Sequence, residues 1–237
     1  MAYVYLIGTG IVASFWLIFY IFRYDLRKKI LLTSIIGGIL GFTEIFFVPN
    51  YWNPQFQVIR IFDNLFLDSL LFAFFLAGFS SVIYQFIFRS PLFKVDKIKT
   101  KLLLIPPIIF LLHLFISEIN VMVFSFGSML IGAFIFYFSD KKLGKPMLLN
   151  GLFTFIFFMI MYIIFWQLFP LLIISYNYEV LSGINIFRIP IEELLFFFAI
   201  GTNFCLIYEI LENSKLKNTL TIFKHNIHNK IKNKKDP

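Results

Sequence analysis

The sequence predicts an all-α polytopic membrane protein, and three observations lead to that prediction. Hydrophobic residues make up 59% of the 237 residues and charged residues only 14%, whereas soluble domains carry roughly 25% charged residues. The 35 Phe side chains are too many for one soluble core of this length. The apolar residues also gather in runs of about 20, the length that a helix needs to cross a bilayer. These observations exclude a water-soluble globular fold.

Seven apolar runs predict seven transmembrane helices. They cover 3–22, 30–48, 65–88, 102–118, 120–138, 148–169 and 189–211. No basic segment precedes the first run and no small-residue cleavage site follows it, so we interpret it as a retained span rather than a signal peptide. Pro106 and Pro107 predict a kink in the fourth span, which membrane helices tolerate.

The basic residues predict the orientation of these spans. Of the 21 Lys and Arg residues, 19 fall in the segments 23–29, 89–101 and 139–147 and in the tail after residue 211. Seven spans place these four segments on one side of the membrane and leave only Arg60 and Arg188 on the other. The positive-inside rule therefore predicts an outside N-terminus and a cytoplasmic C-terminus. The basic tail is expected to lie on anionic lipid head groups or to be disordered, and not to bind nucleic acid.

An internal similarity predicts how the spans are grouped. A shift of 124 residues places 52–86 over 176–210 with seven identities in 35 positions, and it places Asp68 over Glu192 and Trp52 over Tyr176. Two groups of three spans separated by one span cross the membrane in the same direction, as parallel repeats do. The sequence thus predicts a 3+1+3 arrangement. Its parts are a first repeat (1–88), a linker with the fourth helix (89–119), a second repeat (120–211) and a basic cytoplasmic tail (212–237).

Four acidic residues lie near the outer ends of the predicted spans. Asp68, Glu192 and Glu193 fall near the starts of the third and seventh spans, where the helix dipole favours acids. Pro190 also suits a helix start. Glu44, by contrast, lies near the end of the second span, where the dipole disfavours an anion. Charges within a membrane are costly and mark functional sites, so Glu44 calls for a partner, a proton or a function.

The alternatives for these acids are structural. Arg60 and Arg188 are the two basic residues predicted on the same side, and they could form ion pairs with the acids. The sequence contains no metal-binding motif, no phosphate-binding loop and no G-x-G-x-x-G fingerprint. Its one cysteine, Cys205, excludes a disulfide framework. No metal and no cofactor are therefore indicated.

The run 187–197 (FRIPIEELLFF) resembles the Pro-x-Glu-Glu-x-x-Phe-Phe motif of the membrane-bound, flavin-independent lycopene cyclases. Glu44, followed by Trp52, Asn53 and Pro54, resembles the pattern in the first half of that family. The family occurs as two small subunits in some bacteria and as a fused pair in others. The resemblance therefore implies that this chain is a fused form with two three-helix halves.

The resemblance also implies a reaction and its site. The reaction is the acid-catalysed, non-redox ring closure at the ends of lycopene within the cell membrane, with β-rings as the expected product. The implied catalytic residues are Glu44, Glu192 and Glu193; Asp68, where the family pattern would have a Glu, joins them because it aligns with Glu192, and that alignment favours Glu192 as proton donor. The implied substrate-binding residues are Trp52, Asn53, Tyr176, Asn177, Pro190, Phe196 and Phe197. Other enzymes of carotenoid biosynthesis are potential partners.

An alkene is a very weak base, so its proton donor must be a neutral carboxylic acid in a dry site. Burial and a neighbouring carboxylate both favour the neutral form of a carboxyl group. The sequence leaves open the choice between β- and ε-rings, between one and two cyclised ends, and between C40 and C50 substrates. A transporter similar to the SWEET proteins is the alternative from another class, because those proteins also join parallel triplets by a linker helix.

Overall fold

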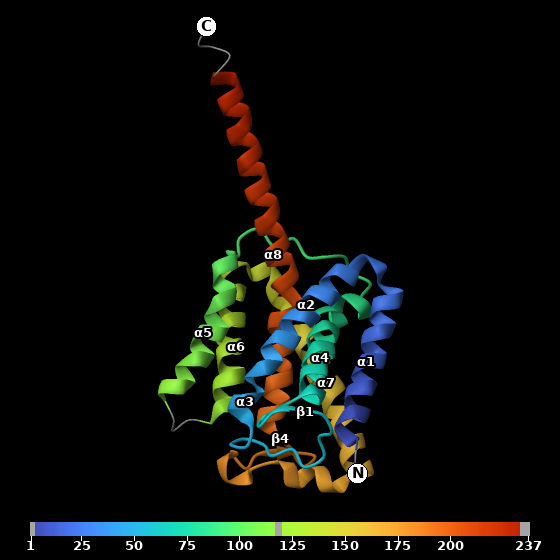
Figure 1. Cartoon of the computed structure of the whole chain (residues 1–237). Helices are drawn as coiled ribbons and strands as arrows, with labels where there is room; N and C mark the ends of the chain where they lie inside the picture. The colour runs from blue at the N-terminus through green and yellow to red at the C-terminus, as the bar shows by residue number, and fades with distance from the viewer. Residues whose placement is uncertain (1–2, 117–119, 233–237) are drawn as a thin grey trace.

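The computed structural model describes residues 3–116 and 120–232, which form a helical bundle with two small hairpins at one end (Figure 1). The α-helices are α1 (Val4–Phe22), α2 (Arg27–Leu40), α3 (Glu44–Phe47), α4 (Leu67–Ile87), α5 (Ile105–Leu111), α6 (Val121–Ser139), α7 (Gly144–Leu168) and α8 (Ile191–Lys232). Short 3-10 helices connect them: η1 (Tyr24–Leu26), η2 (Gly41–Thr43), η3 (Thr100–Leu104), η4 (Leu112–Phe115), η5 (Lys141–Leu143), η6 (Pro170–Ser175) and η7 (Tyr178–Val180). The antiparallel hairpins are β1 (Arg60–Phe62) with β2 (Leu65–Phe66), and β3 (Asn185–Ile186) with β4 (Ile189–Pro190).

Six segments of the described chain are long and apolar enough to cross a membrane. They are Val4–Phe22, Tyr24–Phe47, Leu67–Ile87, Val121–Ser139, Lys141–Leu168 and Ile191–Ser214. These segments coincide with six of the seven predicted spans and make the chain an all-α integral membrane protein. Such helices form because the bilayer offers no partner for an unpaired backbone group, so every N–H and C=O must be satisfied within the segment.

The predicted fourth span, 102–118, has a different form. Its apolar helical part is Thr100–Leu111, which is shorter than a full span. α5 itself begins at Ile105, with Pro106 and Pro107 in its first turn. Proline has no N–H to donate and suits a first turn, so the two prolines mark a helix start rather than a kink in a longer helix. The end of the predicted span includes residues 117–119, which lie outside the described residues.

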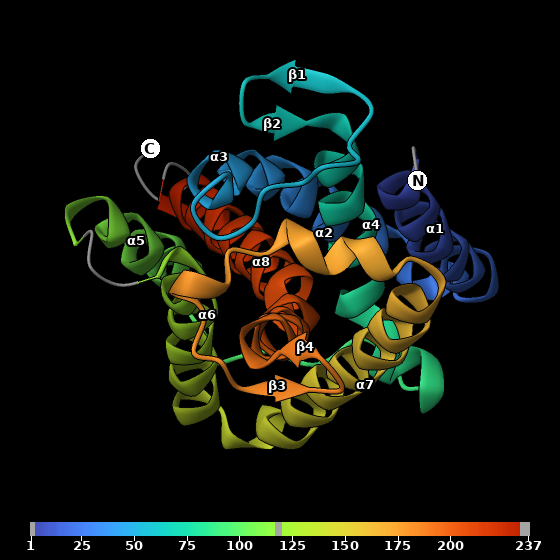
Figure 2. The same ribbon diagram turned by 90° about the horizontal axis from the view of Figure 1, so that it is seen from below.

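The helices α4 and α8 are the two central elements of the bundle. Each begins directly after a hairpin, at the same end of the molecule, and runs toward the opposite end (Figure 1). Their first residues, Leu67 and Ile191, are 124 positions apart. α4 packs against α1, α2, α7 and α8, and α8 packs against α6 and α7 (Figure 2). A hairpin followed by a long helix thus occurs twice in the described chain, before α4 and before α8.

The basic segments gather at the end of the bundle opposite the hairpins. The α1–α2 turn, the chain after α4 and the α6–α7 turn all lie at the end from which α8 projects (Figure 1). α8 continues without a break to Lys232. Residues 212–232 contain no Gly or Pro to interrupt the helix. Whether this basic segment lies on lipid head groups stays a prediction.

A buried ion pair joins α2 to both central helices. The Nζ of Lys29, which is fully buried, donates to Glu209 Oε1 at 2.7 Å, to Gln85 Oε1 at 2.8 Å and to the Cys205 carbonyl at 2.6 Å. From the sequence, Lys29 was expected to lie in the basic loop 23–29. That assignment was wrong because α2 begins at Arg27, which turns Lys29 into the bundle while Lys28 remains exposed.

Small residues allow the helices of each half to approach closely. A Cβ added to Gly37 on α2 would lie 2.2 Å from the Ala77 Cβ on α4. A Cβ added to Gly201 on α8 would lie 2.8 Å from the Cα of Gly151 on α7. Close approach at glycine and alanine is a common basis of helix association in membranes, where apolar side chains gain little by leaving lipid.

Candidate functional site

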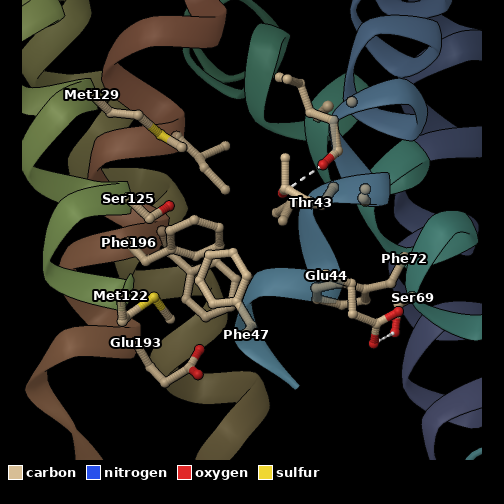
Figure 3. A pocket seen from close by; sticks show the side chains of 18 of the residues that line it. Thr43, Glu44, Phe47, Ser69, Phe72, Met122, Ser125, Met129, Glu193 and Phe196 are labelled. Carbon is tan, nitrogen blue, oxygen red and sulfur yellow. Dashed lines mark hydrogen bonds between the residues drawn. The ribbon is translucent and has the colours of Figure 1, made fainter. Parts of the chain in front are cut away.

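A largely apolar pocket of about 730 Å³ lies among the helices, and every α-helix of the described chain contributes to its lining. Its polar side groups are concentrated near the hairpin end. Glu193 of α8 lies on one wall, and Glu44 of α3 lies with Ser69 of α4 on the opposite wall (Figure 3). The ring of Phe47 lies between them in this view. The pocket therefore places two carboxyl groups from different halves around one apolar space.

Three tyrosines surround the carboxyl group of Glu193. The hydroxyl of Tyr51 donates to Glu193 Oε1 at 3.0 Å, and that of Tyr162 donates to Oε2 at 3.2 Å. Tyr176 donates in turn to the Tyr162 hydroxyl at 3.4 Å. Burial raises the pKa of both Tyr51 and Tyr176, and the charge of Glu193 raises each pKa further. These two phenols thus keep their protons and act as hydrogen-bond donors.

A second set of donors holds Glu44. Its Oε1 accepts from the Ser69 hydroxyl and from Gln57 Nε2 at 3.2 Å, and its Oε2 accepts from the Phe66 backbone N–H at 3.1 Å. These three donors answer the expectation from the sequence that Glu44 needs a partner. Together these donors fix the carboxyl group of Glu44 on the wall that α3 and α4 form.

Asp68 and Glu192 make equivalent contacts with the loops before their helices. Asp68 Oδ2 accepts from the Val58 backbone N–H at 3.0 Å, and Glu192 Oε1 accepts from the Ser182 backbone N–H at 2.7 Å. The donors Val58 and Ser182 are 124 residues apart, and so are the acceptors Asp68 and Glu192. Asp68 lines the pocket, whereas Glu192 is buried but is not part of the lining. Adjacent helical residues point about 100° apart, so Glu193 faces the pocket while Glu192 faces the loop.

No basic residue neutralises these acids in the part of the chain that the structure describes. Its ion pairs join Arg23 to Asp25, Lys29 to Glu209 and Arg60 to Asp63. The alternative in which Arg60 pairs with the membrane acids is not what the structure shows, since Arg60 pairs with the exposed Asp63, three residues away on the β1–β2 hairpin. The described residues also contain no group of three or more His, Cys, Asp or Glu side chains arranged to hold a metal ion.

The structure separates the predicted substrate-binding residues into two groups. Trp52, Tyr176, Phe196 and Phe197 line the pocket. Asn53, Asn177 and Pro190 do not belong to the lining. Asn53 and Asn177 instead hold the two halves together: the Asn53 N–H donates to the Ser175 carbonyl at 2.6 Å, and the Asn177 N–H donates to the Tyr51 carbonyl at 3.0 Å. Pro190 is a buried residue of β4.

Several residues at the site were not predicted from the sequence. Tyr51, Tyr162, Ser69 and Gln57 all contact Glu193 or Glu44. Ser69 occupies the position 124 residues before Glu193, so the internal similarity contained a signal for it, whereas Tyr51 lies just outside the matched segment, next to Trp52. Tyr162 lies within an apolar helix and carries no such signal among the 11 tyrosines of the chain.

The fold and the pocket define an integral membrane protein with a buried, acid-bearing site for an apolar molecule. Residues 120–211 match the family model described as lycopene cyclase. This match supports the assignment of the chain to the lycopene cyclase family, and it confirms the resemblance inferred from the motif around Glu193. It favours a carotenoid cyclase over the transporter considered from the sequence. No curated protein and no solved structure gives a significant match.

Proposed function

We propose that this protein cyclises the ends of lycopene by acid catalysis, with Glu193 as the proton donor. The observation that carries the proposal is the placement of Glu193: it is 8% exposed, it lines an apolar pocket, and a second carboxyl group lies on the opposite wall. A dry, apolar site suits both a water-insoluble carotene and a carboxyl group that must hold its proton until an alkene is in place.

The reaction begins with transfer of the Glu193 proton to C2 of the terminal C1=C2 double bond. This step leaves a tertiary cation at C1 and a carboxylate on Glu193. The π electrons of the C5=C6 bond then form the C1–C6 bond, which moves the cation to C5. Loss of a proton from C6 gives the β-ring, and loss from C4 gives the ε-ring. One proton enters and one leaves, so the product is an isomer of the substrate and no oxidant or reductant is needed.

The surroundings of the pocket supply stabilisation for the cation. Glu44, held by three donors on the wall opposite Glu193, is placed to receive the proton that is lost. Asp68, next to Ser69 on α4, adds a second acid to that wall. The aromatic faces of Trp52, Phe196 and Phe197 can each contribute roughly 0.5–2 kcal/mol through cation–π contact when they are desolvated.

The structure favours Glu193 over Glu192 as the donor, although the sequence alignment with Asp68 favours Glu192. The Oε1 of Glu192 is committed to the Ser182 backbone N–H, and its side chain does not line the pocket. We therefore propose that Glu192 and Asp68 shape the loops that precede α8 and α4. Their shared contact, shifted by 124 residues, supports the parallel two-repeat organisation as part of this proposal.

The proposed orientation places the hairpin end outside and the basic end in the cytoplasm, in the cell membrane. It rests on the segregation of 19 of 21 basic residues to one end of the bundle. The acid pair then lies near the outer face of the bilayer. A carotene dissolved in the membrane reaches the pocket without passing through water.

Pigment analysis of lycopene-accumulating bacteria that express the chain tests the proposal. Wild-type protein should convert lycopene to cyclic isomers, whose ring type is identified by comparison with β- and ε-ring standards. Glu193→Gln keeps the shape of the side chain but removes the transferable proton, so cyclisation should fall roughly 10²–10⁴-fold, the usual contribution of a general acid.

Glu192→Gln is the matched control, because its amide oxygen can still accept from the Ser182 N–H. This variant should retain most of the activity. Both variants must reach the membrane at the wild-type level and elute as single species after extraction in detergent. Undiminished cyclisation by Glu193→Gln would remove its assignment as donor.

A further inference from the structure

The phenols around Glu193 come from both halves of the chain. Tyr51 follows α3 in the first half, whereas Tyr162 on α7 and Tyr176 after η6 belong to the second half. Tyr51 is 2% exposed. Together the two direct donors occupy both oxygens of the carboxyl group, at 3.0 and 3.2 Å. No other residue of the first half has a hydrogen bond to Glu193 among the described side chains.

Packing holds each phenol in one orientation. The ring of Tyr51 meets Phe47 edge-on at 6.3 Å and Tyr176 edge-on at 6.0 Å. The ring of Tyr162 lies between Trp166, at 5.8 Å, and Phe197, at 5.7 Å. The backbone of Tyr51 is fixed as well, since its carbonyl accepts from the Asn177 N–H across the boundary between the halves. The donors are therefore preorganised rather than free to turn away.

We infer that Tyr51 and Tyr162 are positioning residues that orient Glu193 toward the pocket and stabilise the carboxylate left when its proton has been transferred. This inference rests on the proposed function of Glu193 as an acid. Both phenols donate, so their bonds to a negatively charged oxygen are stronger than their bonds to a neutral carboxyl group. Tyr176 supports Tyr162 by donating to its hydroxyl oxygen, which polarises the Tyr162 O–H toward Glu193. Through Tyr51, the first half completes the acid site of the second half.

Tyr51→Phe and Tyr162→Phe each remove one oxygen and leave the ring contacts in place. The rate of cyclisation should fall roughly ten- to a hundredfold in each variant, the range expected for one hydrogen bond to a charged group. Tyr178→Phe is the matched control: Tyr178 is 44% exposed, lies at the same end of the molecule, and has no hydrogen bond to Glu193 in the structure. It should cyclise lycopene at the wild-type rate.

An infrared measurement separates positioning from a general effect on folding. The carboxyl C=O band of protonated Glu193 is identified in detergent-purified protein as the band that disappears in Glu193→Gln. The phenol that donates to the carbonyl oxygen lowers the frequency of this band, so one of Tyr51→Phe and Tyr162→Phe should move it to higher frequency, the double variant should also shift it, and Tyr178→Phe should leave it unchanged. A merely structural role for the tyrosines would lower the yield without moving the band.

The outcomes distinguish the inference from the proposed function. An active wild-type enzyme whose Tyr51→Phe/Tyr162→Phe double variant keeps full activity and an unshifted band would overturn the inference and leave the function standing. A wild-type protein that cyclises nothing, yet shows the band shifts, would remove the proposed function and would confine the tyrosines to holding Glu193.

Discussion

Replacement of Lys29 by Met should destabilise the bundle strongly, because it leaves Glu209 as a buried carboxylate without its cation. Met has nearly the length of Lys and no charge, so the volume is kept while the bonds to Glu209, Gln85 and Cys205 are lost. The remaining contacts of Glu209 Oε1, with Gln85 and the Phe93 N–H, are both 3.4 Å long. Removing one partner of a buried ion pair typically costs about 3–5 kcal/mol.

That energy can be converted into a melting shift. One kcal/mol changes the melting temperature of a chain of 150–250 residues by about 2–4 °C, so the expected loss is roughly 6–20 °C. The assay is the fraction of protein that still elutes as a single species from a size-exclusion column after heating in detergent. Lys28→Met is the matched control, because Lys28 is exposed on the same turn of α2 and should melt as the wild type does.

The double variant Lys29→Met/Glu209→Leu tests the cause. An apolar pair of similar volume often replaces a buried ion pair at little cost, so the double variant should melt above Lys29→Met alone. Equal melting temperatures for Lys29→Met and Lys28→Met would refute the reasoning. The reasoning would also be refuted if the melting temperature of the double variant fell by the sum of the decreases in Lys29→Met and Glu209→Leu. That result would show that the two side chains do not act on each other.

Two further predictions concern packing and topology. Gly37→Ala should lower the melting temperature, because the added Cβ would lie 2.6 Å from the Ala73 carbonyl oxygen on α4. Gly127→Ala, whose added Cβ would have nothing within 4 Å, should be tolerated. Equal melting temperatures for the two variants would refute the role of the close approach between α2 and α4. A fluorescent protein that folds only in the cytoplasm should be bright when it is fused after Pro237, and an alkaline phosphatase fused there should be inactive; the opposite result would invert the proposed orientation.

The apolar runs allowed most of the fold to be predicted, because the length and composition of a run are enough to identify a membrane helix. The functional importance of the acids near the helix ends could also be predicted, since a charged group in an apolar run is costly and seldom present without a role. The failures came from groups whose role depends on a partner far away in sequence. Lys29 was counted as a loop residue because three other basic residues precede it in the segment 23–29 and the apolar run begins only after it. Nothing local shows that Glu209, 180 positions later, lies beside it.

The choice between Glu192 and Glu193 illustrates the same limit. Both are acids in the first turn of α8, and the alignment with Asp68 favoured the residue that binds the loop. Which of two adjacent residues faces a pocket depends on the rotation of the helix about its axis. That rotation is set by packing against α6 and α7, which a single sequence does not specify.

The reciprocal bonds around Trp52 and Tyr176 have a consequence for how the pocket can evolve. The backbone N–H of Asn53 donates to the carbonyl of Ser175, and the N–H of Asn177 donates to the carbonyl of Tyr51. Such reciprocal contacts are the pattern found between two identical subunits related by a two-fold axis. A homodimer built on such an axis must carry every substitution twice, once in each copy. In the proposed two-repeat organisation the two copies are joined in one chain, which removes that constraint, so each copy can diverge alone. Ser69 and Glu193, 124 positions apart, differ in this way: one wall holds a hydroxyl that binds Glu44, and the other holds an acid that accepts from two tyrosines. A symmetric assembly could not give the two ends of its chamber such different chemistry.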